Sequence, residues 1–320
     1  MPSPLILALA WILALALDLL VGEYPNRFHP VVWIGRTISW GERIFLGRGA
    51  RFEFMGGLLL TLTIPAFFAG AAYFTIQAAE ALPIPQLFIT TFWLKASFAW
   101  KALGGAAENV HKHLEQGNVD AARFELRALC SRNASQLNEE ELTEAAISSL
   151  AENLSDSVIA PWFFAVFFGV PGAVFYRAVN TMDAMIGYKN HYKNLGCVAA
   201  RTDDVLNYIP ARITVLFLLA ARSINGRIQN LDTPRAAFAW SVARRDHALT
   251  PSPNGGWPMA TMAGMLGIQL RKTSVYTLGQ RLRPSTLPLI HEAWRFAEGA
   301  AALAWPFFMA AALLMAGLWA

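Results

Sequence analysis

Acidic, amide and basic side chains stand directly on both sides of a short apolar run in the middle of the chain. Before the run come Glu152, Asn153, Ser155 and Asp156, and after it come Arg177, Asn180, Asp183, Tyr188 and Lys189. Residues three or four apart share one face of a helix, so each side can present its polar groups together. Such carboxylates can accept a proton, and such cationic groups can hold a phosphate or a carboxylate. Helix capping is the alternative, but the pairs Glu152 with Asp156 and Asn180 with Asp183 around one apolar run favour a site.

The apolar run itself is too short to cross a bilayer. Val158–Val170 holds about 13 residues, or roughly 20 Å of helix, against a hydrocarbon core of roughly 30 Å. Gly169-Val170-Pro171-Gly172 is a strong turn signal. We therefore predict a helical hairpin that dips into the membrane, or packs within it, and returns to the side from which it came. Its two polar ends would then meet.

A second acidic pair, Asp203 and Asp204, opens another partly apolar segment. Arg201 precedes the pair, and Asn207 and Arg212 follow it. Adjacent aspartates at a helix start can serve the helix dipole alone. They also suit a hard cation such as Mg²⁺, which prefers oxygen ligands and bound phosphates. Both interpretations stay open, and we predict Asp203 and Asp204 as metal ligands.

Two polar loops add further binding groups. His29 lies near Arg27 and Arg36, where it can help to bind an anion, although a histidine before proline is more often structural. Ser252 and Asn254 lie in a turn-rich segment that favours phosphate binding or loop shaping. Ser252 is not expected to be a nucleophile, because no Gly-x-Ser-x-Gly sequence surrounds it.

These segments together resemble the CobD/CbiB family, the adenosylcobinamide-phosphate synthases of cobalamin biosynthesis. The resemblance is carried by AENLSDSVIAP, YRAVNTMDAMIGYK, ARTDDVLNYIPAR and the loop with Asp18, Gly22, His29-Pro30-Val31 and Ile34-Gly35-Arg36. It covers most of the chain in the family's order. It implies an integral enzyme of the cytoplasmic membrane that forms an amide bond between adenosylcobyric acid and aminopropanol or its phosphate.

Two departures from the family's pattern stand out. Glu23 replaces the usual aspartate and keeps its charge. The family's Gly-Arg-Asp-Thr reads Ser131-Arg132-Asn133-Ala134 here. If that aspartate binds metal or acts as a base in relatives, this chain must do without it.

The composition independently predicts a membrane protein. Of 320 residues, 55% are hydrophobic and 15% are charged, whereas about 25% are charged in an average soluble domain. We predict an all-α polytopic membrane protein with five to eight membrane segments. The clearest spanning segments are Leu5–Val21, Met55–Leu82, Gln86–Leu103 and Ala300–Trp319. Lys95 and Lys101 are expected to extend toward the interface.

We expect one membrane-embedded domain, 1–320, with a charged helical insertion at 105–146 on the cytoplasmic side. Asn118 and Asn138 are predicted helix caps within this insertion. The basic loop that holds Arg27, Arg36, Arg43, Arg48 and Arg51 places the N-terminus outside and the polar site toward the cytoplasm. Cys130 and Cys197 show neither metal-ligand spacing nor a disulfide framework.

Residue chemistry and the resemblance together assign roles to the polar residues. Expected catalytic residues are Glu152, Asp156, Asp183 and Lys189. Expected substrate- or phosphate-binding residues are His29, Arg36, Asn153, Arg177, Asn180, Tyr188, Arg201, Asn207, Arg212, Ser252 and Asn254. The resemblance also implies ATP and Mg²⁺, although no Gly-x-x-x-x-Gly-Lys-Ser/Thr loop occurs.

The expected partners are a corrinoid, an amino alcohol or its phosphate, and the lipid bilayer, without nucleic acid. A homo-oligomer or an association with other cobalamin-assembly enzymes is left open. A non-catalytic membrane sensor of the AmpE type is the main alternative, but that branch has largely lost the polar motifs retained here. A transporter would carry polar residues at the membrane midplane of paired repeats, and we find no repeat.

Overall fold

The computed structural model describes residues 2–130, 133–229 and 235–318. The chain divides into two compact units. The first consists of Met1–Ala99, Ala160–Leu206 and Pro306–Ala320, and the second consists of Trp100–Ile159 and Asn207–Trp305. Our prediction of a single embedded domain with an insertion at 105–146 stays a prediction. Ser131 and Arg132, which stand where the family has Gly-Arg of its Gly-Arg-Asp-Thr motif, lie outside the described residues.

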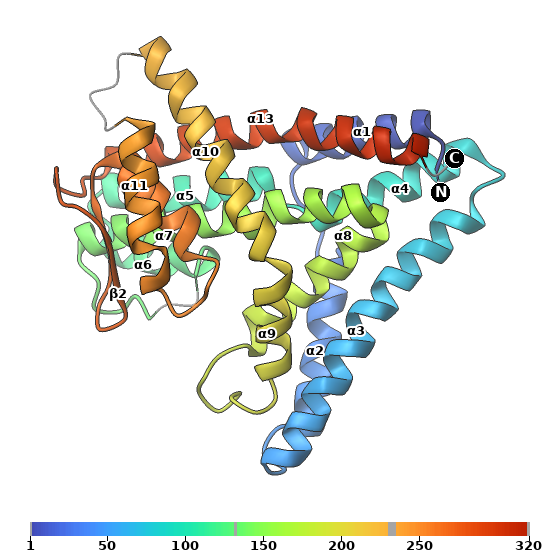
Figure 1. The fold of residues 1–320 in the computed structure, drawn as a ribbon. Helices are drawn as coiled ribbons and strands as arrows, with labels where there is room; N and C mark the ends of the chain where they lie inside the picture. Colours follow the sequence, from blue (N-terminus) through green and yellow to red (C-terminus); the bar gives the residue numbers. More distant parts are fainter. Residues whose placement is uncertain (1, 131–132, 230–234, 319–320) are drawn as a thin grey trace. The chain divides into compact units, whose positions relative to one another are not determined.

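The first unit is built from α1 (Pro4–Leu20), α2 (Pro30–Phe45), α3 (Ala50–Ala78), α4 (Pro83–Ser97), α8 (Ala160–Ile186), α9 (Cys197–Leu206) and the end of α13 (Pro288–Leu318) (Figure 1). Helix starts follow local chemistry. Ser3 accepts a hydrogen bond from the Ile6 amide before Pro4, and Nδ1 of His29 accepts one from the Val31 amide before Pro30. Proline suits the first helical position because its fixed φ fits the helix and its missing N–H is not needed there.

The chain reverses direction within α8, as the turn signal predicts. Gly169 has φ 66° and ψ −171°, a conformation that interrupts the helix and that side chains with a Cβ rarely adopt. Phe164 and Tyr176 then stack with ring centroids 5.0 Å apart. Twelve residues of straight helix would separate them by about 18 Å, so the two arms fold onto each other (Figure 1). The predicted hairpin is confirmed, but the meeting of its polar ends involves residues of both units and stays a prediction.

The second unit consists of α5 (Trp100–Glu115), α6 (Val119–Glu125), α7 (Glu139–Leu154), α10 (Tyr208–Gln229), α11 (Ala236–Asp246), α12 (Gly256–Leu266) and the first part of α13. The predicted caps are confirmed. Asn118 accepts from the Ala121 amide, and Asn138 forms a reciprocal capping box with Glu141. Gly264 lets α12 approach α11 closely, because a Cβ there would lie 2.7 Å from the Ala239 backbone.

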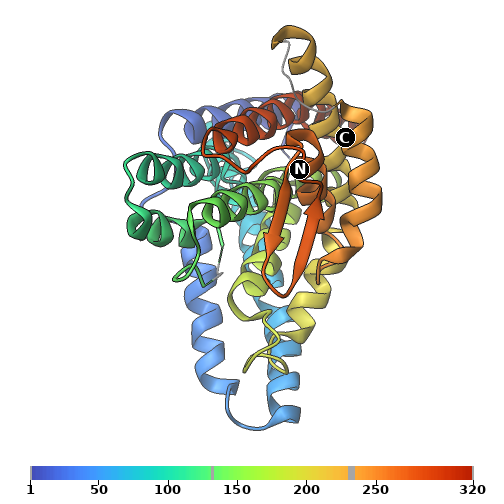
Figure 2. The same cartoon turned by 90° about the vertical axis from the view of Figure 1, so that its left-hand side faces the viewer.

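A two-stranded hairpin was not part of the sequence prediction. The strands β1 (Gln269–Lys272) and β2 (Tyr276–Gly279) pair antiparallel, with Leu270 opposite Leu278 (Figure 2). The buried Glu144 of α7 holds this hairpin, since its carboxylate accepts hydrogen bonds from the amide and guanidinium of Arg271. Arg271 is thus paired with a residue 127 positions away in the sequence.

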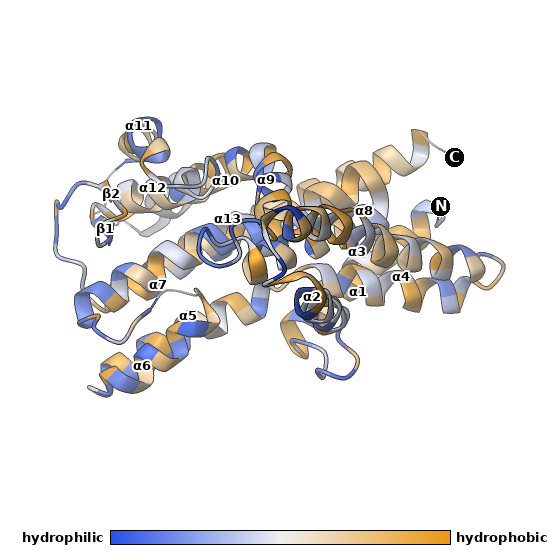
Figure 3. Ribbon diagram, turned by 90° about the horizontal axis from the view of Figure 1, so that it is seen from below, coloured by the Kyte–Doolittle hydropathy of each residue, from blue (hydrophilic) through white to orange (hydrophobic). Residues whose placement is uncertain are grey.

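The all-α membrane class is confirmed. Among the described residues, three helices are long and apolar enough to cross a membrane, namely Ala50–Ala78, Glu139–Ile186 and Pro288–Leu318. The pair α9 and α10, bent by 45°, makes a fourth if it counts as one broken span, and α1 is a shorter apolar helix. Our prediction of five to eight membrane segments also includes such shorter apolar helices. Figure 3 shows the contrast between the mainly hydrophobic α8 and the mixed surface of α5 and α6.

The predicted third helix, Gln86–Leu103, is wrong in its bounds. It consists of two helices, because α4 ends at Ser97 and α5 begins at Trp100, with Phe98 in an extended conformation between them. Ala96, Phe98, Ala99 and Trp100 are apolar on both sides of this point, and no glycine or proline marks it, so the sequence carries no clear sign that α4 ends here.

Candidate functional site

In the first unit, α8 and α9 bring together an arginine, an asparagine and an aspartate. Nη1 of Arg177 donates to Oδ1 of Asn180 at 3.2 Å, and Nδ2 of Asn180 donates to Oδ1 of Asp203 at 3.3 Å. Asn180 therefore uses both ends of its amide, which fixes its orientation. Asp203 is buried and Asp204 is half-buried beside it. The prediction that this pair opens a helix is wrong, because both residues lie in the last turn of α9, where a carboxylate does not favour the helix dipole. The segments YRAVNTMDAMIGYK and ARTDDVLNYIPAR are therefore in contact.

At and beyond the end of α8, some of the predicted site residues are engaged by the backbone and others are exposed. Asp183 is half-buried, and a Cβ at Gly187 would overlap its Oδ1 atom, so its carboxylate lies against the backbone that ends the helix. Tyr188 donates its hydroxyl to the Ala184 carbonyl at 2.8 Å. Lys189 and Arg201 are exposed. These two cations are accessible to an anionic ligand, whereas the hydroxyl of Tyr188 is engaged by its own helix.

The loop between α1 and α2 forms a separate ionic cluster. Nδ1 of His29 accepts from the Val31 amide, so its Nε2 carries the hydrogen and donates to Oε2 of Glu23 at 2.7 Å. Nζ of Lys95 lies 3.1 Å from Glu23 and 3.1 Å from Asp18. Burial would raise the pKa of Glu23, but His29 and Lys95 outweigh it, so this pKa lies below its usual value. Glu23 is therefore ionised at neutral pH.

Lys95 contradicts the expectation that it extends toward the membrane interface. Its side chain is fully buried, as is that of Asp18. A buried ammonium is costly unless it is paired, and two carboxylates pair it here. Sequence reasoning missed Lys95 as a partner because it comes 72 residues after Glu23.

Arg36 lies on an open groove of the first unit. The groove has a volume of about 510 Å³ and is lined by Val32, Gly35, Arg36, Ser39, Trp40, Arg43 and Met185. Arg36 and Arg43 give it a positive charge, and Trp40 gives it an exposed aromatic face. Such a groove suits an anionic ligand with apolar parts.

In the second unit, Arg212 is held in an aromatic stack. Its guanidinium lies 3.5 Å from the ring centre of Tyr208 and 5.1 Å from that of Trp257, and it donates to Oδ1 of Asn254 at 3.3 Å. The hydroxyl of Ser252 accepts from the Asn254 amide at 3.2 Å. Ser252 therefore shapes the loop that presents Asn254 to Arg212. Asn207 is buried at the start of the same segment.

Glu152 reaches the same loop from α7. A Cβ on Gly255 would lie 2.5 Å from Oε1 of Glu152, so this carboxylate packs against the Gly255 backbone. Asp156 follows in a π-helical turn, Ser155–Ile159. Such widened turns are rare and occur frequently at functional sites. Asn153 instead serves structure, because its Nδ2 donates to the carbonyls of Leu129 and Ser149.

His247 and Trp257 complete this cluster, and the sequence analysis assigned neither of them a role. Their rings stack with centroids 3.9 Å apart. Burial lowers the pKa of His247, and the charge of Arg212 lowers it further. His247 is therefore neutral at pH 7. The sequence feature that could have indicated both residues is their position in or next to the turn-rich segment that holds Ser252 and Asn254.

Asn133, the main departure from the family's pattern, lines a pocket of the second unit. The pocket has a volume of about 660 Å³ and includes Arg123, Arg127 and Cys130. Oδ1 of Asn133 accepts from the Ser135 amide at 3.1 Å. An aspartate would keep this hydrogen bond and add a negative charge near two arginines.

Comparison with known proteins agrees with the resemblance in the motifs. The family model described as CobD/Cbib protein matches residues 11–297. Cobalamin biosynthesis protein CobD of Dehalococcoides mccartyi (strain CBDB1) is 41% identical over 277 residues, which cover 86% of this chain and 88% of the relative. Probable cobalamin biosynthesis protein CobD of Methanothermobacter thermautotrophicus is 39% identical, with coverage of 84% and 85%. The CobD protein of Geobacter metallireducens is 37% identical, with 88% of each chain covered. No solved structure gives a significant match.

Proposed function

The chain belongs to the CobD/CbiB protein family, and we propose that it joins adenosylcobyric acid to aminopropanol or its phosphate by an amide bond. The pathway, cobalamin biosynthesis, is the part of this proposal that the names of the relatives support. The reaction, its substrates and its dependence on ATP and Mg²⁺ go further. They rest on the resemblance in the motifs and on the chemistry of the polar clusters.

The observation that carries the proposal is the chain of contacts from Arg177 through Asn180 to Asp203. It joins two motifs that lie 23 residues apart, and it presents a cation and a buried carboxylate together. A structural role alone would not require so many polar groups beside a helical hairpin rich in phenylalanine. The arrangement suits a phosphorylated substrate, because the guanidinium can bind phosphate oxygens.

Amide formation needs an activated acid, since a carboxylate is a poor electrophile toward an amine. ATP is the proposed second substrate, which would convert the carboxylate into an acyl phosphate before the amine attacks. Arg36, Lys189 and Arg201 are exposed cations of the first unit, and Arg212 is a stacked cation of the second. In this proposal they bind the phosphates and the corrinoid's carboxylate.

The donor set around Asp203 fits a hard divalent cation. The carboxylate is buried among polar neighbours, and Asp204 adds a second one on the same helix. Mg²⁺ needs only one or two protein carboxylates when water and phosphates supply its other ligands. Asp203 and Asp204 would hold it, and it would neutralise the charge of the bound phosphates.

The amine must lose a proton as the new bond forms. Glu152 and Asp156 are half-buried carboxylates of the second unit, and Glu152 lies against the loop that holds Asn254. We propose one of them as the base. Asp183 of the first unit would orient a cationic group. The reaction would take place on the cytoplasmic side of the inner membrane.

A reconstituted reaction tests the proposal. The purified protein is incubated with adenosylcobyric acid, aminopropanol phosphate, ATP and Mg²⁺, and the corrinoid product is identified by mass spectrometry. The expected result is a mass gain equal to the amino alcohol phosphate less one water, with one ADP formed per product. The same reaction with free aminopropanol distinguishes the two amine substrates. Binding of the corrinoid without product under all these conditions would favour a non-catalytic binding protein.

A further inference from the structure

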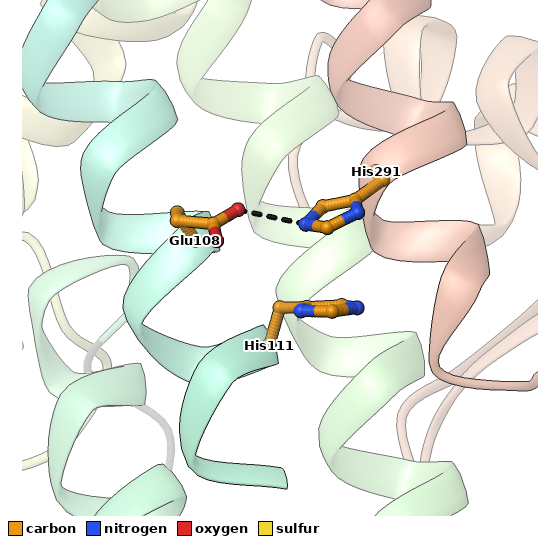
Figure 4. Close-up of side chains that lie close together, drawn as sticks. All are labelled: Glu108, His111 and His291. Atoms are coloured by element: carbon orange, nitrogen blue, oxygen red, sulfur yellow. Dashed lines mark hydrogen bonds and ion pairs between the residues drawn. The ribbon is translucent and has the colours of Figure 1, made fainter. Parts of the chain in front are cut away.

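A cluster of two histidines and a glutamate lies in the second unit, on residues to which the proposed reaction assigns no role. Glu108 and His111 come from α5 and His291 comes from α13 (Figure 4). One ligand atom of each residue lies within 4.8 Å of those of the other two. Nε2 of His291 lies 2.7 Å from Oε2 of Glu108, and the rings of His111 and His291 stack with centroids 3.7 Å apart. We propose that these three side chains form a binding site for a divalent transition-metal ion of the zinc type.

The backbone already holds the three residues in position. Glu108 and His111 are one turn apart, so they project from one face of α5. A Cβ on Gly104 would lie 2.5 Å from the ring of Trp294, so α5 and α13 approach closely one turn from the cluster. Glycine at that position is what permits this approach. The histidine from α13 is therefore brought to the pair on α5 by helix packing and needs no metal to place it.

Metal binding requires the three ligand atoms to move slightly closer together. Zn²⁺ lies about 2.0 to 2.2 Å from nitrogen and oxygen ligands in a tetrahedral site, which sets the ligand atoms roughly 3.4 Å apart. The separation of at most 4.8 Å thus has to shrink by about 1.4 Å. Rotations of the side chains can achieve this, because Glu108 is exposed and His291 is half-exposed. The exposed side also leaves room for water as a fourth ligand.

The donor set selects the class of ion. Imidazole nitrogen suits Zn²⁺, Co²⁺ and Ni²⁺, whereas Mg²⁺ prefers oxygen ligands. A Glu-x-x-His pair on one helix, completed by ligands from neighbouring helices, is also the arrangement that helical bundles use to hold metal ions. The ion would join two segments 183 residues apart in the sequence. We therefore expect it to stabilise the packing of α5 against α13.

Direct metal binding tests the proposal without an activity assay. The full chain, with its purification tag removed, is stripped with a chelator in detergent and titrated with Zn²⁺ by calorimetry or with Co²⁺ by visible absorption. Wild type is expected to bind one equivalent, to show the intense visible bands of a low-coordinate Co²⁺ site, and to unfold at a higher temperature with Zn²⁺. His111→Ala, His291→Ala and Glu108→Gln should each weaken binding at least tenfold.

The control is His113→Ala, because His113 lies on the same helix but outside the cluster. It should bind the ion as wild type does. Gel filtration and circular dichroism of each metal-free variant show that it is folded, and Glu108→Gln keeps the size of the side chain if an alanine variant fails to fold. Equal binding by wild type and the three cluster variants would overturn the proposal, as would no binding by wild type. The cluster would then be an ion pair beside stacked histidines.

Discussion

Nζ of Lys95 lies 3.1 Å from Oδ1 of Asp18, and both side chains are fully buried. The pair joins α4 to α1, and Glu23 and His29 extend it into the following loop. His29, which the sequence suggested as part of an anion site, is thus bound to Glu23, and Glu23 is bound to Lys95. These contacts fix the loop that leads into α2, the helix that carries the exposed Arg36.

Removal of Lys95 should destabilise the protein strongly. Lys95→Met leaves the buried Asp18 carboxylate without its cation, which costs about 3 to 5 kcal/mol of unfolding free energy. The double variant Lys95→Met/Asp18→Asn should recover part of this loss because it removes both charges. Lys112→Met changes an exposed lysine and should stay within about 0.5 kcal/mol of wild type. Denaturant unfolding in detergent measures these differences, and a Lys95→Met protein as stable as wild type would show that the pair is not structural.

Local signals in the sequence predicted local structure well. The caps at Asn118 and Asn138 and the reversal at Gly169 depend on residues within a few positions, and all three are confirmed. The end of α4 at Ser97 was missed, because no glycine or proline marks it. Partners far apart in sequence, such as Glu144 and Arg271, were also missed, since spacing carries no information about them.

In the candidate site, too, the sequence indicated the residue types, but it did not indicate most of the contacts between distant residues. The motifs selected the polar residues of the candidate site, and α8 and α9 do bring Asn180 to Asp203. The motifs did not predict that Asn153 is bound to backbone carbonyls, or that His247 and Trp257 stack beside Arg212. These features come from tertiary packing. The roles assigned to the site residues stay predictions, which the following variants test.

The metal-ligand assignment predicts a specific kinetic change. Asp203→Asn and Asp204→Asn remove a charge from the proposed Mg²⁺ site and keep the size of the side chain. Each should raise the Mg²⁺ concentration for half-maximal turnover about tenfold or more. Asp120→Asn is the control, because this aspartate is 92% exposed and pairs with Arg123. Turnover measured over a Mg²⁺ titration gives the result, and an unchanged Mg²⁺ response in both site variants would exclude these aspartates as ligands of the ion.

The contact of Glu152 with Gly255 predicts the effect of a single methyl group. Gly255 has φ −56°, which alanine adopts readily, so Gly255→Ala should fold. The new Cβ would displace the flexible end of Glu152 and lower the maximal rate with little change in the Mg²⁺ response. Glu152→Gln should lower that rate by about 10² to 10⁴, as expected on loss of a general base. The control is Gly105→Ala, where a Cβ meets no atom within 4 Å. Normal rates in both site variants would exclude Glu152 as the base.

The lowered pKa of His247 predicts a loss of stability in mild acid. Burial and the charge of Arg212 hold this pKa below its ordinary value of 6.5 in the folded protein. The unfolded chain therefore binds more protons than the folded protein between the folded pKa and 6.5. Stability should be fully present above about pH 6.5 and fall as the pH drops through the folded pKa. Asp246 next to it titrates in a lower range, because burial is outweighed by Arg245 and the Gly279 amide, which lower its pKa from 3.8.

Unfolding temperatures of wild type and His247→Gln, measured from about pH 7.5 to about pH 5, test this expectation. The variant should lose less stability than wild type over this range. His111 also has a lowered pKa, by burial and by the charge of His291, and it contributes a loss of the same sign in both proteins. The comparison therefore depends on the difference between the two pH curves. Parallel curves would contradict the prediction.

The proposed orientation predicts which residues can be labelled from outside the cell. By the positive-inside rule, the arginine-rich segment that starts at Arg27 predicts a cytoplasmic position for the loops around the polar residues. Single cysteines replace exposed residues in a Cys130→Ser/Cys197→Ser background. The chosen positions are Phe28, Lys189, Arg201 and Leu249, all exposed near residues of the proposed site.

These cysteines should resist an impermeant thiol reagent in intact cells and react once the membrane is opened. Ile84→Cys is the matched control, because Ile84 is 70% exposed at the start of α4, which the same rule predicts to lie outside. It should react in intact cells. Gel filtration of each variant in detergent shows that the chain has inserted and folded normally, because Lys189→Cys and Arg201→Cys change residues of the proposed site and are expected to lower activity. Labelling of Phe28→Cys, Lys189→Cys, Arg201→Cys or Leu249→Cys from outside would contradict a cytoplasmic site, because the polar segments would then face opposite sides of the membrane.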